Sequence, residues 1–420
     1  MDKRFFNMFG LSEDQAIALL QTPPDQLQSP TDRYVAVAHL INFPTERAIK
    51  ALIEVVENAD SEMYNRITRR KAVESLGRLG VKKALPIIRT CLGDEDIYTV
   101  ENAVWAIGEI GTEDEEILEE IAQLLEKPGQ TYRVIIQTLA KLGYQPALER
   151  IKNLLTSDDE SIVSAAVAAI SRLTGDYSQM EKVVAFLQHS NVNARRACIQ
   201  DLIDTQYYQA IPQIARCPVS IVFRLRGIRL LATHEIFTWV EPYLDMVIQD
   251  HPNDLEFVHE YDQKPSIDFL INELYHTDFG RCYLASKNLL ELYAELAPEA
   301  LLKTWENSAH NDYGAHYHVI KILGWLKYEP AYDLLIQALN NTSPQFQKSR
   351  AAAAIALGNL GEKQVIPLLL EALNSQIFDL KYATLLALEK LGDNSFRDRA
   401  INDADELIRA KANSMNNSYP

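Results

Sequence analysis

The chain has 420 residues, of which 47% are hydrophobic and 24% are charged, a composition typical of a folded, soluble protein. Its formal net charge of −17 argues against polyanionic partners such as nucleic acid or an anionic membrane surface. The first ten residues hold no apolar run long enough for a signal peptide or a membrane span, so we expect a cytoplasmic protein. The scattered cysteines form no CxxC pair and are expected to be buried, reduced thiols: Cys91, Cys198, Cys217 and Cys282.

A recurring block, in which a helical pattern ends on Leu-Gly or a similar pair, dominates the chain. The early copies are SLGRLG, AIGEIG, TLAKLG and ISRLTG, which end at Gly80, Gly111, Gly143 and Gly175. Their ends are 31, 32 and 32 residues apart, a period typical of stacked helical hairpins. Later copies end at Gly361 and Gly392. The sequence therefore predicts an all-α protein, an α-solenoid of HEAT-like helical-hairpin repeats.

Glycine and proline mark the ends and starts of the predicted helices. A helix commonly ends at a left-handed residue, which glycine adopts without a steric penalty from Cβ. Pro86, Pro212 and Pro367 fall where the following helix begins, a position at which the missing amide proton costs no hydrogen bond. Each repeat thus carries its own start and stop signals.

The repeat period is interrupted once. We predict an N-terminal repeat block over residues 1–232, an irregular helical insertion or joint over 233–280, and a C-terminal repeat block over 281–420. The insertion contains an aromatic and acidic segment, FVHEYDQKP, from Phe257 to Pro265. The polar tail from Asn413 to Pro420 is expected to be frayed.

The functional surface is expected on the helix of each repeat that ends on Leu-Gly. Its small and leucine positions face inward, and the intervening positions share the other face, which lines the concave surface in solenoids of this pattern. These positions are rich in aromatic and basic residues, a combination that suits a flat, conjugated, anionic ligand. The candidates are Arg66, Arg70, Tyr98, Glu101, Trp105, Arg133, Tyr313, Tyr317 and His318.

Other chemistry is weakly indicated. The chain has no GxGxxG, P-loop, HExxH or GxSxG motif, so nucleotide, zinc-protease and serine-hydrolase functions have no support. The segment HNDYGAHYH concentrates histidines, but a spacing of two puts His316 and His318 on different faces of a helix, which argues against a metal site. The alternative for each charged candidate is an ordinary surface side chain, and for Trp105 it is simple packing.

Three segments resemble a known family: MDKRFFNMFGLSEDQAIALL at the start, NFPTERAIKALIE from Asn42 to Glu54, and YNRITRRKAVESLGRLG from Tyr64 to Gly80. They are similar to the E/F-type phycobilin lyases, in particular to the long single-chain phycoerythrin lyases of the CpeY kind and their lyase-isomerase relatives. The resemblance extends over essentially the whole chain. The blocks on either side of the irregular segment look like the two short chains of other family members joined together.

The resemblance implies an enzyme that attaches phycoerythrobilin through a thioether to a cysteine of a phycobiliprotein, with phycoerythrin alpha as the expected acceptor. Some relatives also isomerise the bilin to phycourobilin. The bilin is then the substrate, and no tightly bound cofactor or metal is expected. The nucleophilic thiol would belong to the partner, so the enzyme would contribute orientation and proton transfer.

With a bilin as ligand, Trp105 would stack on a pyrrole ring, and Arg70 and Arg133 would pair with propionates. Tyr98, Arg66 and Tyr313 complete the expected bilin-binding set. The expected catalytic residues are Glu101, Tyr317 and His318, and Glu101 lies one helical turn before Trp105.

Two other functions compete with the lyase. A non-enzymatic HEAT-repeat scaffold or chaperone would hold a protein in the same groove, and it predicts no change in visible absorbance with bilin. A HEAT-like DNA-repair glycosylase would also use a concave basic surface, but the negative net charge argues against it.

Overall fold

The computed structural model describes residues 10–58, 60 and 62–416, and over these residues the chain is helical with no strand, as the repeat pattern predicts. The first nine residues of the quoted opening segment and the last four of the predicted frayed tail lie outside the described residues. The chain divides into two compact units, Met1–Met180 and Glu181–Pro420, called unit 1 and unit 2 below. The division at 232 and 280, based on repeat period, stays a prediction.

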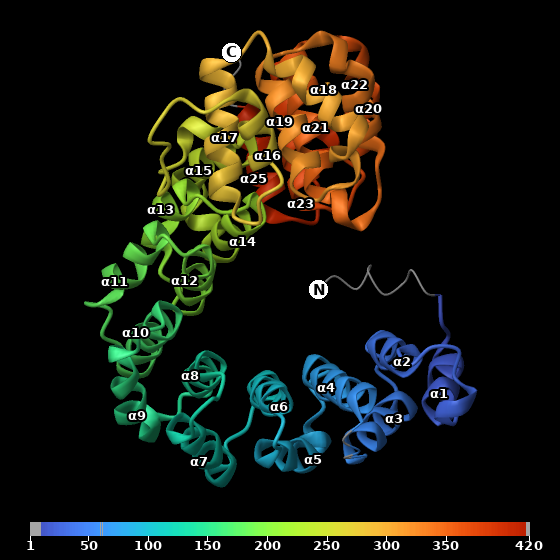
Figure 1. The fold of residues 1–420 in the computed structure, drawn as a ribbon, viewed down its shortest axis with the longest axis vertical. Helices are drawn as coiled ribbons and strands as arrows, with labels where there is room; N and C mark the ends of the chain where they lie inside the picture. The colour runs from blue at the N-terminus through green and yellow to red at the C-terminus, as the bar shows by residue number, and fades with distance from the viewer. Residues whose placement is uncertain (1–9, 59, 61, 417–420) are drawn as a thin grey trace. The chain divides into compact units, whose positions relative to one another are not determined.

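Unit 1 is an arc of stacked helices, with α2, α4, α6 and α8 on its concave side (Figure 1). Successive members of this layer pack directly on one another. Its α-helices are α1 Glu13–Gln21, α2 Asp32–Leu40, α3 Glu46–Glu57, α4 Met63–Arg78, α5 Leu85–Thr90, α6 Ile97–Ile110, α7 Glu115–Gln123, α8 Tyr132–Lys141, α9 Leu148–Asn153 and α10 Glu160–Thr174. One continuous apolar core runs between the two layers.

The start and stop signals are confirmed. The predicted helix-ending glycines all have positive φ: Gly80 64°, Gly111 78°, Gly143 69°, Gly175 76°, Gly361 83° and Gly392 71°. Pro86, Pro212 and Pro367 lie in the first turn of α5, α13 and α22.

Neighbouring helices of one layer approach very closely where a glycine faces an alanine. A Cβ added to Gly77 of α4 would lie 2.8 Å from Ala106 Cα of α6. In unit 2, a Cβ on Gly324 would lie 2.4 Å from Ala356 Cβ. Any larger residue at these glycines would push the two helices apart.

Unit 2 is also built of stacked helices, but α15 additionally packs on α21, α23 and α25, which come much later in the chain. Its α-helices are α11 Met180–Ala185 at the boundary, α12 Val192–Asp204, α13 Ile211–Arg216, α14 Ile221–Leu231, α15 Phe237–Gln249, α16 Ile267–Glu273, α17 Phe279–Leu292, α18 Ala297–Asn307, α19 Ala315–Trp325, α20 Tyr332–Asn340, α21 Gln347–Leu360, α22 Ile366–Ala372, α23 Phe378–Lys390, α24 Arg397–Ala400 and α25 Glu406–Asn416.

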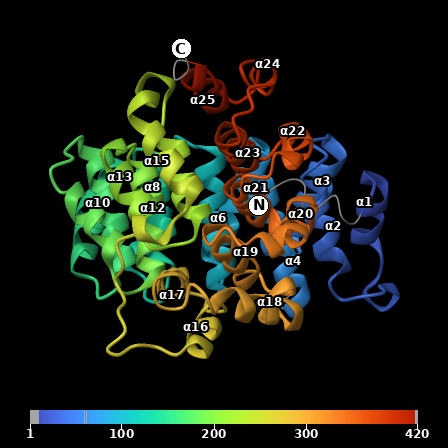
Figure 2. The ribbon, with the colours of Figure 1, turned by 90° about the horizontal axis from the view of Figure 1, so that it is seen from above.

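The interruption of the repeat period contains α15, α16 and an extended segment between them, drawn in yellow and leading to α16 in Figure 2. The extended segment is fixed to its surroundings by several contacts. The Glu256 amide donates to the Arg216 carbonyl at 3.0 Å, and the Tyr293 hydroxyl donates to the Pro265 carbonyl at 2.8 Å. The segment is therefore an ordered connection between α15 and α16, held by hydrogen bonds to its neighbours.

The expected fraying from Asn413 onward is wrong for residues 413–416, because α25 continues to Asn416. The Ser414 hydroxyl donates to Glu241 of α15 at 2.6 Å, and Met415 is buried. Contacts with α15 thus hold the end of the helix. Among the described residues, no helix is both long and apolar enough to span a bilayer.

Candidate functional site

The candidate residues of unit 1 lie on α4, α6 and α8, which are successive helices of the concave layer. The structure brings Arg70 and Tyr98 together, with the guanidinium carbon 4.9 Å from the ring centroid. Arg70 also forms a two-pronged ion pair with Asp96, the N-cap residue of α6, at 2.5 Å from Nε and from Nη2. Tyr98 is 54% exposed, so one face of this cation–π pair is open to a ligand.

Glu101 and Trp105 follow on α6, both partly buried. Burial raises the pKa of the Glu101 carboxyl, which forms no hydrogen bond or ion pair with any residue that the structure describes. The Trp105 ring packs over the Gly77 position of α4, and the Arg78 guanidinium carbon lies 5.7 Å from its centroid. Glu101 is therefore an uncommitted acid beside a half-covered aromatic ring.

The remaining candidates of unit 1 differ from each other. Arg66 is exposed on α4. Arg133 of α8 donates to the Ser161 carbonyl at 2.6 Å, a bond to the start of α10. The expected cluster of Arg70, Arg133, Glu101 and Trp105 is thus spread over three helices, with Arg70 held by Asp96.

The candidates of unit 2 are not where the repeat pattern predicts. Tyr317 and His318 were expected on an exposed face of their helix, but both are buried, because α19 is enclosed and buried on all sides from Ala315 to Gly324. A helix packed on every side has no solvent face. Tyr313, which precedes α19, remains 49% exposed.

Tyr317 belongs to a buried polar cluster centred on Asp250. The Asp250 carboxylate pairs with Arg224 and accepts hydrogen bonds from the hydroxyls of Tyr317 and of Tyr283, the latter at 2.8 Å. Burial and the neighbouring carboxylate raise the pKa of both tyrosines well above the ordinary value, so both stay neutral and donate.

His318 lies among aromatic rings, with the centroids of Phe279 and Tyr283 each 5.0 Å from its own. Neither ring nitrogen has a hydrogen-bond partner in the structure. Burial, and then the nearby Lys348 and other cations, hold the pKa of His318 well below its ordinary value. His318 is therefore a neutral imidazole.

The histidine-rich segment contains His316, whose ring has partners within the protein. His316 accepts or donates at Nδ1 with the Ser349 hydroxyl at 2.8 Å and stacks on Phe346 with centroids 4.1 Å apart. Among residues 10–58, 60 and 62–416, no group of three or more His, Cys, Asp or Glu side chains is placed to bind a metal ion.

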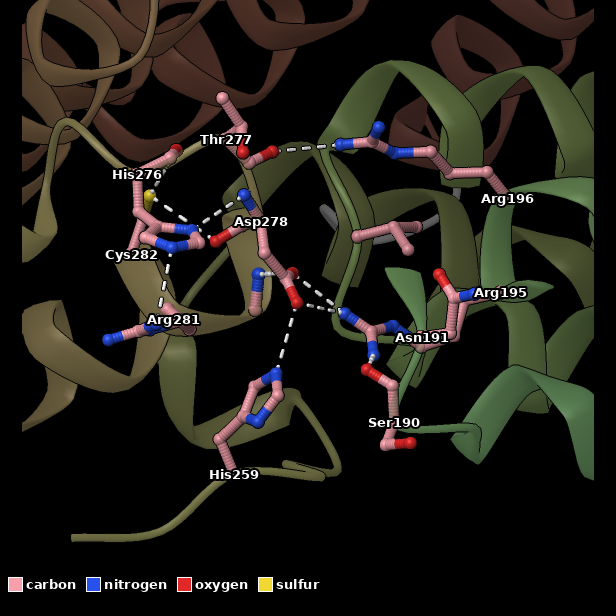
Figure 3. A network of polar contacts seen from close by, with 12 residues as sticks. Ser190, Asn191, Arg195, Arg196, His259, His276, Thr277, Asp278, Arg281 and Cys282 are labelled. Atoms are coloured by element: carbon pink, nitrogen blue, oxygen red, sulfur yellow. Dashed lines mark hydrogen bonds and ion pairs between the residues drawn. The ribbon is translucent and has the colours of Figure 1, made fainter. Parts of the chain in front are cut away.

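A further network surrounds Asp278, which begins α17 (Figure 3). The carboxylate accepts from Arg195 Nη2 at 2.7 and 2.8 Å and is bonded to His259 Nε2 at 3.0 Å. Although burial opposes it, these hydrogen bonds lower the pKa of Asp278. The network joins α12, α17 and the extended segment that contains His259.

All four cysteines are free and buried, as expected. Burial raises the pKa of Cys217 and of Cys282 to about 12. A thiol with so high a pKa is a poor nucleophile near neutral pH.

Comparison with known proteins gives the family. A model described as HEAT repeats matches residues 62–129 and 343–415. The chain is 58% identical to "Uncharacterized phycocyanin operon protein Y" of Pseudanabaena tenuis, over 99% of this chain and 100% of that one. It is 33% identical to "Bilin biosynthesis protein CpeY" of Synechococcus sp., over 91% of this chain and 97% of that one. The chain belongs to the CpeY-like family of bilin biosynthesis proteins.

A shorter relative of this CpeY-like chain is "Phycocyanobilin lyase subunit alpha" of Nostoc sp. It is 28% identical over 54% of this chain and 86% of its own length. The CpeY-like chain is thus much longer than this lyase subunit, in keeping with the length noted from the sequence.

Sequence reasoning missed the residues on which the buried cluster of this CpeY-like protein depends, namely Asp250, Arg224 and Tyr283. Asp250 follows α15 directly, in the left-handed conformation with φ 50°, and only tertiary packing places it against α14, α17 and α19. The sequence DHPND, which follows the apolar pattern of α15, indicates that a helix ends there. It does not indicate that Asp250 belongs to a buried polar cluster.

Proposed function

We propose that this protein is a phycobilin lyase, which attaches a linear tetrapyrrole through a thioether to a cysteine of a phycobiliprotein subunit. The observation that carries the proposal is the 33% identity to CpeY across 91% of this chain. The proposed chromophore is phycoerythrobilin, and the proposed acceptor is the alpha subunit of phycoerythrin. Isomerisation to phycourobilin is a further proposed step.

The proposed reaction balances without a redox partner. The acceptor's S–H adds across a carbon–carbon double bond of bilin ring A: an S–C bond forms, the π bond breaks, and a proton returns to the chromophore. Isomerisation relocates double bonds and protons within the bilin. The bilin is therefore substrate, and no tightly bound cofactor is proposed.

Glu101 is the proposed proton donor, because its carboxyl has no ion pair or hydrogen bond with any residue that the structure describes and burial raises its pKa. Tyr98 and Trp105 on the same helix offer rings for stacking on the pyrroles. Arg70 uses Nε and Nη2 for Asp96, which leaves Nη1 for a propionate. Arg66 and Arg133 are proposed as further basic contacts.

In unit 2, Tyr317 and His318 stay proposed catalytic residues, with burial restricting how they act. The Tyr317 hydroxyl donates a hydrogen bond to Asp250, and His318 is neutral. Direct transfer to the bilin would require the chromophore to reach past Tyr313. The two residues could instead act indirectly, by fixing where the Phe279 and Tyr313 rings lie, and the bilin would then not have to enter the buried cluster.

Coexpression with the phycoerythrin alpha subunit in cells that make phycoerythrobilin tests the proposal. We expect chromophore-dependent absorbance on the subunit and a bilin-bearing cysteine peptide by mass spectrometry. Glu101→Gln is expected to slow attachment about a hundredfold, the scale of losing a general acid. Glu113→Gln, at an exposed loop position of the same unit, serves as the control.

A matched pair of aromatic variants tests the stacking surface. Tyr98→Ala is expected to weaken bilin binding, whereas Tyr177→Ala, which removes a ring that is comparably exposed in the same unit, leaves it unchanged. A protein that binds the subunit but never changes the absorbance of bilin would instead be a scaffold, and the lyase proposal would be wrong.

Replacing all four cysteines with serine or alanine is expected to leave attachment intact, since each thiol is buried and two have a pKa of about 12. The variant is assayed by coexpression after circular dichroism confirms its fold. If it folds but attaches no chromophore, the expectation is wrong, and a covalent intermediate on this chain becomes the next hypothesis to test.

A further inference from the structure

Buried lysines are unusual, and the five that the structure describes can be compared directly. Four have an acceptor. Lys71 pairs with Glu74, Lys381 with Asp403, and Lys411 with Glu241 and Asp245, and Lys321 donates to the Gln249 carbonyl. Lys348, which is 4% exposed, is the exception: its Nζ has no hydrogen-bond partner. A buried ammonium without an acceptor is costly, and it marks a position that a ligand can complete.

The Lys348 ammonium lies within a box of aromatic rings. Its Nζ is 3.4 Å from the ring centroid of Tyr313, 4.2 Å from that of Phe279 and 5.1 Å from that of Tyr317. Phe279 and Tyr317 are buried, whereas Tyr313 is half exposed. Of the three rings, Tyr313 is therefore the one that lies between Lys348 and the solvent-exposed surface.

Lys348 also lies in the first turn of α21, a 14-residue helix. Free amides and the helix dipole favour negative charge at this end of a helix and disfavour a cation. Burial lowers the pKa of Lys348 to about 7, with smaller opposing effects from Cys282, Asp250 and Asp312. An entering carboxylate would pair with the ammonium and occupy the position that the helix end favours.

A second cation, Arg196, contacts the segment that carries Phe279 of this box. Its guanidinium carbon lies 5.3 Å from the centroid of the Phe223 ring. Burial raises the pKa of Tyr313, and the positive charge of Arg196 opposes this rise. Arg196 donates from Nη2 to the Thr277 carbonyl at 2.9 Å, and Figure 3 shows it reaching toward the Asp278 network that fixes this segment. It forms no ion pair with any described residue, and its Nε has no hydrogen-bond partner among them.

We propose that Lys348 and Arg196 form a carboxylate-binding subsite under Tyr313, and that the two cations pair with the two propionates of one bilin. The Tyr313 ring rotates away from Lys348 to admit the first carboxylate and then stacks on the conjugated system. This inference rests on the proposed function, since it assigns part of the same substrate. It makes Lys348 and Arg196 substrate-binding residues and adds no chemical step.

The test compares biliverdin, which has two free propionates, with its dimethyl ester, which has none. Affinity is measured by absorbance titration for the native chain, Lys348→Met, Arg196→Gln and Lys381→Met. Loss of a charged hydrogen bond should weaken biliverdin binding about ten- to a hundredfold in Lys348→Met and in Arg196→Gln. Lys381→Met removes another buried lysine of unit 2 and should bind biliverdin as the native chain does.

The dimethyl ester has no free carboxylate, so it distinguishes a lost carboxylate contact from a general loss of bilin binding in a variant. We expect the native chain to bind the ester more weakly than biliverdin, and Lys348→Met to bind the ester as the native chain does. Native biliverdin affinity in folded Lys348→Met, or equal weakening for acid and ester, would overturn the subsite and leave the lyase proposal standing. Binding of neither compound by the native chain would overturn both.

Discussion

Replacing Lys348 with methionine is expected to raise the free energy of unfolding by about 1 to 4 kcal/mol near pH 7. Methionine keeps the long apolar stem among Phe279, Tyr313 and Tyr317 and removes an ammonium that has no acceptor. Urea unfolding monitored by circular dichroism gives the difference. The variant should therefore be more stable than the native chain and poorer at binding bilin acids.

The pH dependence of this gain has a definite sign. Burial lowers the pKa of Lys348 from 10.5 to about 7, so between these values the unfolded chain binds a proton that the folded chain does not. The native lysine therefore destabilises the fold fully below pH 7, and the effect fades as pH rises toward 10.5. The advantage of Lys348→Met should be large at pH 6.5 and nearly gone at pH 10.

Lys381→Met is the control for this stability measurement. Its ammonium is paired with Asp403 at 2.6 Å, so methionine there leaves a partly buried carboxylate without its partner and should lower stability. A stabilising effect of the same size in both variants would show that any buried lysine of unit 2 behaves this way, and the special position of Lys348 would be refuted.

Replacing Asp250 with alanine is expected to lower the free energy of unfolding of unit 2 by about 3 to 5 kcal/mol, because it leaves the buried Arg224 guanidinium unpaired. The hydroxyls of Tyr283 and Tyr317 lose their acceptor at the same time. Alanine also tolerates the left-handed backbone at this position less well than aspartate. Urea unfolding of the full chain should show an earlier transition or loss of soluble protein.

Two further variants make the Asp250 result specific. Asp250→Asn keeps an oxygen acceptor and a side chain that tolerates positive φ, so its loss of stability should be smaller than that of alanine. Asp398→Ala removes an exposed carboxylate of unit 2 and should change nothing measurable. If Asp250→Ala has the same urea midpoint of unfolding as the native chain, the prediction is wrong and Arg224 must find another acceptor.

The fold follows from the sequence because its signals are local. The Gly80 and Gly111 repeats can be recognised from a left-handed stop, a proline or polar start and a row of small residues, none of which depends on distant parts of the chain. The same local pattern places Tyr98, Glu101 and Trp105 correctly on one helix of the concave layer.

The candidate site is harder to predict from the sequence, because its side chains bond to residues of other repeats. Nothing near Arg70 indicates that Asp96, at the start of the next repeat's helix, takes its guanidinium. In unit 2, the repeat pattern predicts a surface position for Tyr317. Helix α17 packs on α19 and Tyr317 bonds to Asp250 at the end of α15 instead, and the pattern of one repeat does not record what packs on it.

The packing of α15 on α25 also limits how this protein can evolve. In unit 1, the main contacts join helices that are close in sequence, so a whole hairpin can be gained or lost at modest cost. In unit 2, Lys411 must meet Glu241 and Asp245, which precede it by 170 and 166 residues. A hairpin inserted between them would displace Lys411 from its partners, so we expect repeat duplication to be tolerated less readily between Glu241 and Lys411 than in unit 1.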